Sequence, residues 1–297
     1  MSLTLGCCLG LFIFSSEGRA VIKDKDLDSI ICRIYNLSNN SMSLQDVVRE
    51  LLKKDISIIG EVHGNFYHHL VQSKILTALS RAVNRKYRRG IYIAFEQLNF
   101  VNYVDNYRRD QRFGKPSLYE MLRYYGFDNN SWRLDLYYPL FKAAYDAFLM
   151  EGAEWIGLNV PVRVLQKAGC DGSENISECF IGYKRRSRQS DMILREKIKN
   201  SHKGREDASV SKMNMIQELR DLFIANQVGR LYAPAIVFVG NVHAHNKIGV
   251  PVYLSGDKSV ISVGMKEVDN CGEVDRNAVS HNSDVGYDII IATERFD

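Results

Sequence analysis

The stretch DISIIG at residues 55–60, followed at once by Glu61, Val62 and His63, decides the fold of this chain. It is a short continuous apolar run bounded by turn residues, which is typical of a strand covered on both faces of a parallel sheet. Residues 235–240 (AIVFVG) repeat the pattern far along the chain and are followed by Asn241, Val242 and His243. Both runs end in Gly, one polar residue, Val and His. We therefore expect the two imidazoles to lie over one crevice.

Further apolar runs predict further strands, at residues 90–95 (GIYIAF), 154–160 (EWIGLNV) and 260–265 (VISVGM). Residues 287–293 (YDIIIAT) predict a last strand at the edge of the sheet. Helical periodicity falls between the strands, at residues 43–53, 67–84, 139–151 and 213–228. This alternation predicts an α/β fold with a mostly parallel central sheet flanked by helices. The residues at 101–136 predict helical excursions over the sheet, and the charge-rich residues 171–212 predict a helical cap.

Length and composition set the class of protein. The chain has 297 residues, 45% apolar and 25% charged, as is usual for a globular protein. Its net charge of +4 gives no reason to expect a nucleic-acid partner. We expect residues 1–20 to be a signal peptide, because residues 3–14 are almost wholly apolar and small residues follow. Residues 21–54 would then lead into one domain at 55–297, with an insertion at about 171–212.

The cysteines bear on the compartment of the protein. Cys7 and Cys8 follow Leu5 and Gly6 in a poor lipobox, so a lipid-anchored N-terminus is an alternative to simple export. Without these two of the six cysteines, four are left: Cys32, Cys170, Cys179 and Cys271. An even number suits an oxidising compartment, and the lack of a CxxC pair argues against a thiolate zinc site. Cys170 and Cys179 are close enough in sequence to bridge a loop, and free buried thiols are an equal alternative.

Polar residues gather where the predicted strands end. Glu61 and His63 follow the first strand, Glu96 the second and His243 the fourth, while Asn159 ends the third. Ligands of open parallel sheets bind at the carboxyl ends of the strands. Two chemistries fit these residues. The first is ferric haem, whose iron accepts His or Tyr, and the second is a catalytic zinc or another divalent metal.

Several ordered segments resemble one known family: residues 60–63 (GEVH) with His68 and His69, residues 95–96 (FE), Trp132 with residues 137–141 (YYPLF), residues 158–161 (LNVP), residues 217–221 (QELRD), residues 240–243 (GNVH) and residues 249–251 (GVP). Together they resemble the ChaN-like haem-binding family within the Tiki superfamily of uptake proteins. The resemblance runs from about residue 56 to the C-terminus and is weakest between residues 171 and 213.

The resemblance implies a haem-binding lipoprotein of the cell envelope that takes part in iron acquisition. It implies haem at a homodimer interface, with Tyr and His as iron ligands, and an outer-membrane haem receptor as a further partner. Tyr137 is our first candidate for the phenolate, and His63, His68 or His69 for the imidazole. Neighbouring helical residues point roughly 100° apart, so at most one of His68 and His69 should face the site. The other predicted haem-binding residues are Glu61, Glu96, Asn159 and His243.

The same superfamily also contains hydrolases that use the Glu and His residues of these motifs. The alternative function is therefore a metal-dependent hydrolase, with Glu61, His63, Glu96 and His243 as its catalytic residues. In that reaction a His would bind the metal or act as base, and a Glu would orient or deprotonate water. No GxSxG motif occurs, so a serine nucleophile of the α/β-hydrolase type is not supported. The balance of these observations leans away from an enzyme.

Two other features predict no role in the site. The basic run at residues 184–188 (KRRSR) is typical of a solvated helix face. His245 shares the loop of His243 and is expected to be a bystander.

Overall fold

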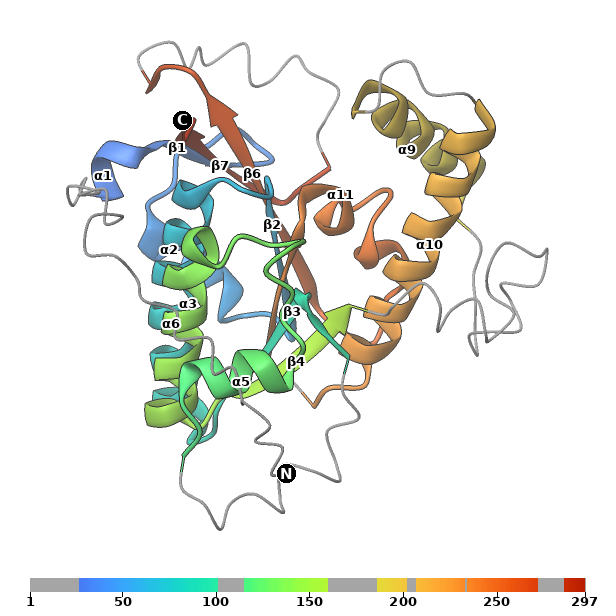
Figure 1. The fold of residues 1–297 in the computed structure, drawn as a ribbon. Helices are drawn as coiled ribbons and strands as arrows, with labels where there is room; N and C mark the ends of the chain where they lie inside the picture. Colours follow the sequence, from blue (N-terminus) through green and yellow to red (C-terminus); the bar gives the residue numbers. More distant parts are fainter. Residues whose placement is uncertain are drawn as a thin grey trace, which may run out of the picture.

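The computed structural model describes residues 27–100, 115–159, 186–201, 207–232, 234–271 and 286–296. A seven-stranded sheet lies at its centre, in the order β1-β7-β6-β2-β5-β3-β4, and helices cover both faces (Figure 1). The strands are β1 (Ile31–Asn36), β2 (Ile56–Glu61), β3 (Tyr92–Asn99), β4 (Glu154–Asn159), β5 (Ala235–Gly240), β6 (Val260–Val268) and β7 (Ile289–Glu294). All neighbouring pairs are parallel except β1 with β7. The predicted α/β fold is confirmed.

The position of β2 in the sheet explains why residues 55–60 form a continuous apolar run. β2 lies between β5 and β6, and every residue of β2 and β5 is buried. A strand with neighbours on both edges and helices on both faces can expose no side chain, which accounts for its continuous apolar run. The parallel register pairs Glu61 with Gly240, so the two Gly-x-Val-His motifs begin side by side.

Helices form a layer on each face of the sheet (Figure 1). One layer contains α2 (Leu44–Leu51), α3 (Phe66–Tyr87), α5 (Leu118–Tyr124) and α6 (Leu134–Glu151). The other contains α10 (Asp207–Gly229), the short α11 (Asn241–Ala244) and the 3-10 helix η2 (Val250–Tyr253). Alternation along the strands divides the core accordingly. Phe95 packs with residues of α3 and α6, whereas the preceding Ala94 packs with residues of α10.

The lead-in contributes to the sheet, which the sequence did not predict. β1 pairs antiparallel with β7, so β7 lies between β1 and β6 and the prediction of an edge strand at 287–293 is wrong. Short α1 (Leu27–Ile30) precedes β1. A disulfide joins Cys32 of β1 to Cys271, beyond the end of β6, a pairing that the sequence left open. Cys170 and Cys179 lie outside the described residues.

The predicted cap is present in part. α9 (Arg188–Ser201) packs on α10, and α10 begins at Asp207, earlier than the predicted start at residue 213. α6 also begins earlier than predicted, at Leu134, and contains Pro139. The expected signal peptide and lipobox lie outside the described residues. Within the residues that are described, we find no helix with the length and apolar character needed to cross a membrane.

One member of the basic run corrects a prediction. Arg186 is only 5% exposed, and its guanidinium lies 3.4 Å from the carboxylate of Asp221 on α10. The side chain also donates to the hydroxyl of Tyr253, at 3.1 Å. Arg186 is therefore a buried partner of α10 rather than part of a solvated helix face, because a buried carboxylate requires a compensating charge.

Candidate functional site

The carboxyl edge of the sheet brings together the four acid and imidazole residues that follow its strands. Pairing of β3 with β5 ends at Phe95, so the next side chain, Glu96, emerges beside Gly240. A Cβ atom on Gly240 would lie 2.8 Å from Nε2 of His63 and 3.7 Å from Oε2 of Glu96. The Glu96 carboxylate is also 3.1 Å from Nε2 of His243. Glu61, His63, Glu96 and His243 therefore belong to one site at this edge.

Alternation along the strands divides these residues into two units on opposite faces of the sheet. Glu61 points toward α3 and α6, where its Oε1 accepts three hydrogen bonds. The donors are Tyr137 Oη at 2.6 Å, His63 Nδ1 at 2.9 Å and Gln97 Nε2 at 3.0 Å. Nε2 of His69 lies 3.4 Å from the other carboxylate oxygen. We call these five residues the Glu61 unit.

Electrostatics keep Glu61 ionised. Burial alone would raise the pKa of this carboxyl, but the neighbouring His69 and His63 outweigh it and hold the pKa well below its ordinary value. An ionised carboxylate can only accept, so His63 carries a proton on Nδ1, and the neutral form of the ring has its lone pair on Nε2. Burial would lower the pKa of His63, but its bond to Glu61 and the charge of Glu96 raise the pKa above the ordinary value.

His63 is the accessible imidazole of the site. Its side chain is 43% exposed, and its ring meets the ring of Trp132 edge-on, with 4.9 Å between centroids. Gly64 follows at φ +85°, a conformation that L side chains rarely adopt, and the chain turns there into α3. Asn65 begins that helix by accepting from the backbone N–H of His68. This tight turn holds His63 at the surface above Gly240.

The other predicted imidazoles are buried. His69 donates from Nδ1 to the carbonyl of Leu136, at 3.0 Å, and stacks on Tyr137. His68 turns away, and its Nδ1 accepts from the backbone N–H of Val62 at 3.0 Å. Burial lowers the pKa of His68 to about 3, so this ring is neutral. One of the two neighbours therefore faces the site and the other supports the loop of His63, as the helical spacing predicted.

The hydroxyl of Tyr137, our first candidate for the phenolate, is engaged inside the Glu61 unit. Its residue is 1% exposed and its hydroxyl donates to Glu61. Burial, together with the charge of Glu61, raises the pKa of the phenol well above its ordinary value. Ligation of the iron by a Tyr137 phenolate stays a prediction, and it would need this bond broken and the ring uncovered.

The second unit, the Glu96 unit, lies on the α10 face. Its centre is His243, whose Nε2 is 3.1 Å from Glu96 and whose Nδ1 is 2.6 Å from Asp221. Gln217 lies one helical turn before Asp221 and is within 2.8 Å of the same Nδ1. Arg186 completes the unit through Asp221. The sequence did not assign Asp221, Gln217 or Arg186 to the site, although residues 217–221 are one of the segments that resemble the ChaN-like family.

The pKa values of the Glu96 unit depend on one another, and burial raises the pKa of Asp221 against the opposing effect of His243 and Arg186. Burial alone would lower the pKa of His243, but Glu96 and Asp221 outweigh it and raise the pKa to about 10. Burial would raise the pKa of Glu96, but His243 lowers it to about 2. His243 is therefore an imidazolium held between two carboxylates, with both ring N–H groups engaged. Both nitrogens of this ring are therefore occupied by carboxylates within the unit.

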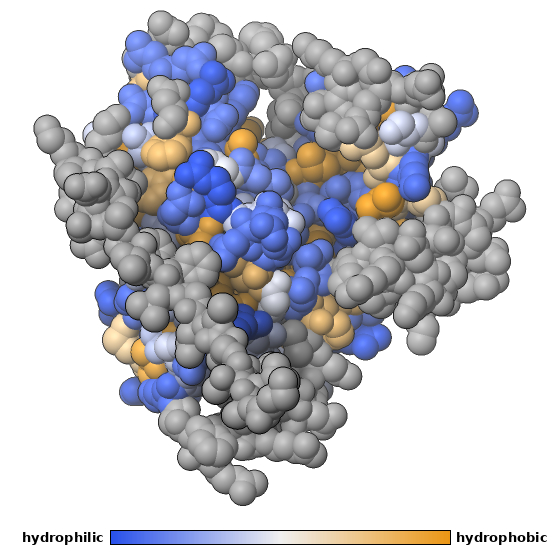
Figure 2. Space-filling view, in the orientation of Figure 1, coloured by the Kyte–Doolittle hydropathy of each residue, from blue (hydrophilic) through white to orange (hydrophobic). Residues whose placement is uncertain are grey.

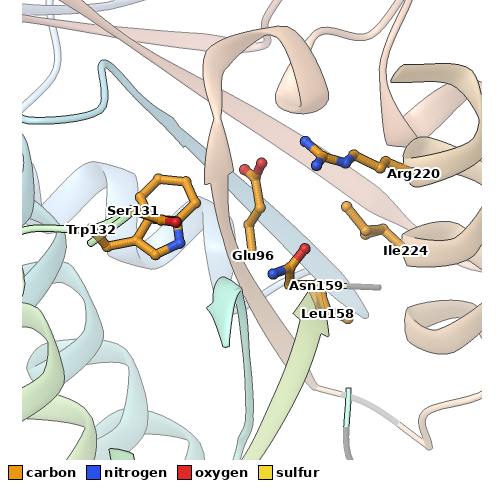
Figure 3. Close-up of a pocket in the computed structure, with 7 residues that line it drawn as sticks. All are labelled: Glu96, Ser131, Trp132, Leu158, Asn159, Arg220 and Ile224. Carbon is orange, nitrogen blue, oxygen red and sulfur yellow. The ribbon is translucent and has the colours of Figure 1, made fainter. Parts of the chain in front are cut away.

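A cleft of about 220 Å³ opens between the two layers of helices at this edge (Figure 3). Trp132 forms one wall and Arg220 the opposite one, with the Glu96 carboxylate between them. The cleft is lined by Glu96, Ser131, Trp132, Leu158, Asn159, Arg220 and Ile224. Asn159 donates to the side-chain oxygen of Asn99, at 3.1 Å. Hydrophilic and apolar side chains meet in the hollowed middle of this face in Figure 2.

The donor set does not favour the zinc alternative. Within the described ranges, no group of three or more His, Cys, Asp or Glu side chains is placed to hold a metal ion. His243 cannot supply a lone pair while both of its nitrogens are protonated. His245 makes its own local contacts, with its Nδ1 accepting from the backbone N–H of Lys247, and stays outside the two units.

Fold and site define an α/β protein with a ligand site at the carboxyl edge of a mostly parallel sheet. Residues 47–254 match the sequence profile described as haem-binding uptake, Tiki superfamily, ChaN. The chain belongs to this family, because the match spans more than half of its length.

Two solved structures are similar. The first shows cofacial haem binding to ChaN of Campylobacter jejuni, with a TM-score of 0.69 and 20% identity over 88% of this chain and 96% of that one. The second is the type III effector HopBA1, with a TM-score of 0.44 and 13% identity over 90% of this chain and 99% of that one. No curated protein matches the sequence. The ChaN structure confirms the α/β fold.

Proposed function

We propose that the protein binds haem at the carboxyl edge of its sheet, with Nε2 of His63 as a ligand of the iron. Membership of the haem-binding uptake family supports haem as the ligand. The observation that carries the proposal is His63 itself. This imidazole is 43% exposed, is fixed through Nδ1 by an ionised carboxylate, and makes no hydrogen bond through Nε2 to any described residue.

Such an arrangement is what a metal-binding histidine requires. Histidines that bind metals almost always donate their other ring N–H to a carboxylate or carbonyl, which fixes the tautomer and raises the basicity of the ligand. Glu61 supplies this acceptor, and Tyr137 and Gln97 hold it in place. The bound haem would supply an iron centre that accepts an imidazole. Tyr137 contributes through Glu61 in this proposal.

The size of the cleft indicates how haem would lie. Pockets that enclose a small-molecule ligand usually measure about 300–1,000 Å³, and this cleft is about 220 Å³. The macrocycle would therefore lie across the mouth of the cleft, with one face uncovered. We propose that a second copy of the chain covers that face, so that haem lies at a homodimer interface, as the cofacial haem of C. jejuni ChaN suggests.

The disulfide supports a location for this function. Disulfides persist in oxidising compartments such as the bacterial periplasm, and Cys32 is joined to Cys271. We propose that the chain is exported to the cell envelope, where it takes part in iron acquisition and receives haem from an outer-membrane receptor. Mass spectrometry of the mature N-terminus tests this, because an acyl group on Cys7 or Cys8 would indicate lipid anchoring, and a start near residue 21 would indicate cleavage.

Titration with hemin, followed by the Soret band, tests the ligand. His63→Ala should weaken hemin binding by about 10- to 100-fold, in line with the loss of a ligand or its orientation, and added imidazole should restore the spectrum of the parent. Tyr137→Phe should retain imidazole ligation with a modestly shifted Soret band. A charge-transfer band that disappears in Tyr137→Phe would assign the iron ligand to Tyr137 instead. Unchanged affinity and spectrum in His63→Ala would overturn the proposal.

A further inference from the structure

Polar residues of the α10 segment at 217–221 point to two different places. Gln217 and Asp221 are one helical turn apart and both reach His243, at 2.8 and 2.6 Å. Arg220, between them, points from α10 into the cleft toward Glu96 (Figure 3). The charge network around His243 uses the first two side chains and leaves Arg220 without a role in it.

Arg220 has a buried donor without an acceptor. Its Nε is inaccessible to solvent and has no hydrogen-bond partner in the described part of the chain. Buried polar groups in proteins are nearly always hydrogen-bonded, and an unsatisfied donor on a charged group is more unfavourable than one on a neutral group. The cleft in front of Arg220 is therefore where its acceptor is expected.

Glu96 is not that acceptor. Its Oε1 faces Nε2 of His243, and its Oε2 accepts from the backbone N–H of Gly240 at 2.8 Å. No ion pair joins Arg220 to a carboxylate among the described residues. Both oxygens of the Glu96 carboxylate are thus engaged by other donors, which leaves the guanidinium of Arg220 to a ligand of the cleft.

The other walls define what kind of anion fits. Trp132, Leu158 and Ile224 are apolar, and Ser131 and Asn159 add polar groups at the cleft. A guanidinium offers Nε and Nη donors in a planar fork that matches a carboxylate in bidentate fashion. We infer that Arg220 binds a carboxylate whose ligand packs its apolar body against Trp132.

The identity of this ligand rests on the proposed function. Haem has carboxylates, its propionate arms, joined to an apolar macrocycle, so it fits both Arg220 and Trp132. Trp132 also contacts the ring of His63, so the ligand of the iron and the carboxylate subsite are adjacent. A cleft of about 220 Å³ admits an arm of the porphyrin but not the macrocycle. Arg220 would thereby set the orientation in which haem approaches His63.

Comparison of hemin with hemin dimethyl ester tests the inference, because the ester lacks only the negative charges of the propionates. The unmodified protein should prefer hemin by about 10- to 100-fold, the range expected for a charge-assisted pair. Arg220→Gln should bind hemin as weakly as the ester, and Arg220→Lys should recover part of the preference. Arg230→Gln is the matched control, since Arg230 is exposed just beyond α10. Melting temperatures should be equal or higher in Arg220→Gln, which removes an unsatisfied buried donor.

The outcomes separate this inference from the proposed function. An unchanged preference for hemin in Arg220→Gln, with His63-dependent binding intact, would overturn the role of Arg220 alone. Failure of the unmodified protein to bind hemin would overturn the proposed function. In that case 3-phenylpropionate, a free carboxylate with an aromatic body, becomes the probe. If the unmodified protein binds 3-phenylpropionate and Arg220→Gln does not, the carboxylate subsite stands for a ligand other than haem. If the unmodified protein does not bind 3-phenylpropionate, the carboxylate subsite is refuted.

Discussion

The Glu61 unit and the Glu96 unit come from two motifs of the same form, yet they present opposite kinds of histidine. In the first, Glu61 holds one nitrogen of His63, and the other nitrogen is available at a surface that is 43% exposed. In the second, both nitrogens of His243 are engaged, by Glu96 and Asp221, in a side chain that is 5% exposed. The comparison teaches that two motifs of the same form can hold an imidazole by one nitrogen or by both, according to the carboxylates that distant segments place around it.

Removal of the enclosed imidazole should have the largest effect. His243→Ala leaves Glu96 and Asp221 buried with less compensating charge, and loss of one partner of a buried ion pair costs about 3–5 kcal/mol of unfolding free energy. His63→Ala should change stability by less than about 1 kcal/mol, because that side chain is partly solvated. Urea denaturation of both variants measures the difference. Equal destabilisation would contradict the distinction between the two units.

Stability should depend on pH at both ends of the range through two members of the Glu96 unit, His243 and Glu96. The pKa of His243 is raised from 6.5 to about 10, so its contribution to stability is fully present below about 6.5 and is lost as pH rises toward 10. The pKa of Glu96 is lowered from 4.5 to about 2, so its contribution is present above about 4.5 and is lost as pH falls toward 2. Urea denaturation from pH 3 to pH 10 should therefore show the greatest unfolding free energy between about pH 4.5 and 6.5. In His243→Gln the unfolding free energy should vary less with pH.

Hemin binding should depend on pH through the other unit. A proton on Nε2 of His63 competes with iron, and the pKa of His63 is raised above its ordinary value of 6.5. Affinity should therefore fall as pH is lowered through that raised pKa and should be greatest on the alkaline side. Titrations of the parent and of His63→Ala separate this effect from haem aggregation. A pH profile shared by both proteins would exclude His63 as its cause.

Gly240 provides a sharper test, because it touches both units. A Cβ at this position would lie 2.8 Å from Nε2 of His63, whereas the backbone φ of −61° is ordinary for any residue. Gly240→Ala should displace His63 and weaken hemin binding by about tenfold, with a stability change of about 1–3 kcal/mol from overpacking. The same substitution at Gly256, where a Cβ meets nothing within 4 Å, is the control. Full retention of hemin affinity in Gly240→Ala would show that hemin binding does not require His63 at its position above Gly240.

A modest effect on stability is expected at Tyr137. Tyr137→Phe removes one hydrogen bond to Glu61, which keeps its bonds to His63 and Gln97, so the loss should be about 1 kcal/mol of unfolding free energy. Chemical denaturation measures it. A loss as large as that of His243→Ala would mean that the Glu61 unit is as tightly coupled as the Glu96 unit.

Sequence patterns succeeded where they reflect local burial. The six predicted strands are present because a continuous apolar run identifies a strand that is covered on both faces. β1 was missed because its burial is mixed, and β7 was placed at the edge because its partner was not foreseen. The basic run at residues 184–188 predicted that Arg186 is solvated, because the run itself contains no acidic residue. Its carboxylate partner, Asp221, lies far along the chain on α10.

By itself, the sequence determined that two Gly-x-Val-His motifs stand at the carboxyl ends of buried parallel strands, because hydrophobic periodicity is a local property of the chain. Only the tertiary structure decided that His63 offers a nitrogen and His243 does not. That outcome depends on Tyr137, Asp221 and Arg186, which reach the edge of the sheet from different helices and loops. Contacts between distant segments, rather than the local pattern, set the proton and the exposure of each imidazole.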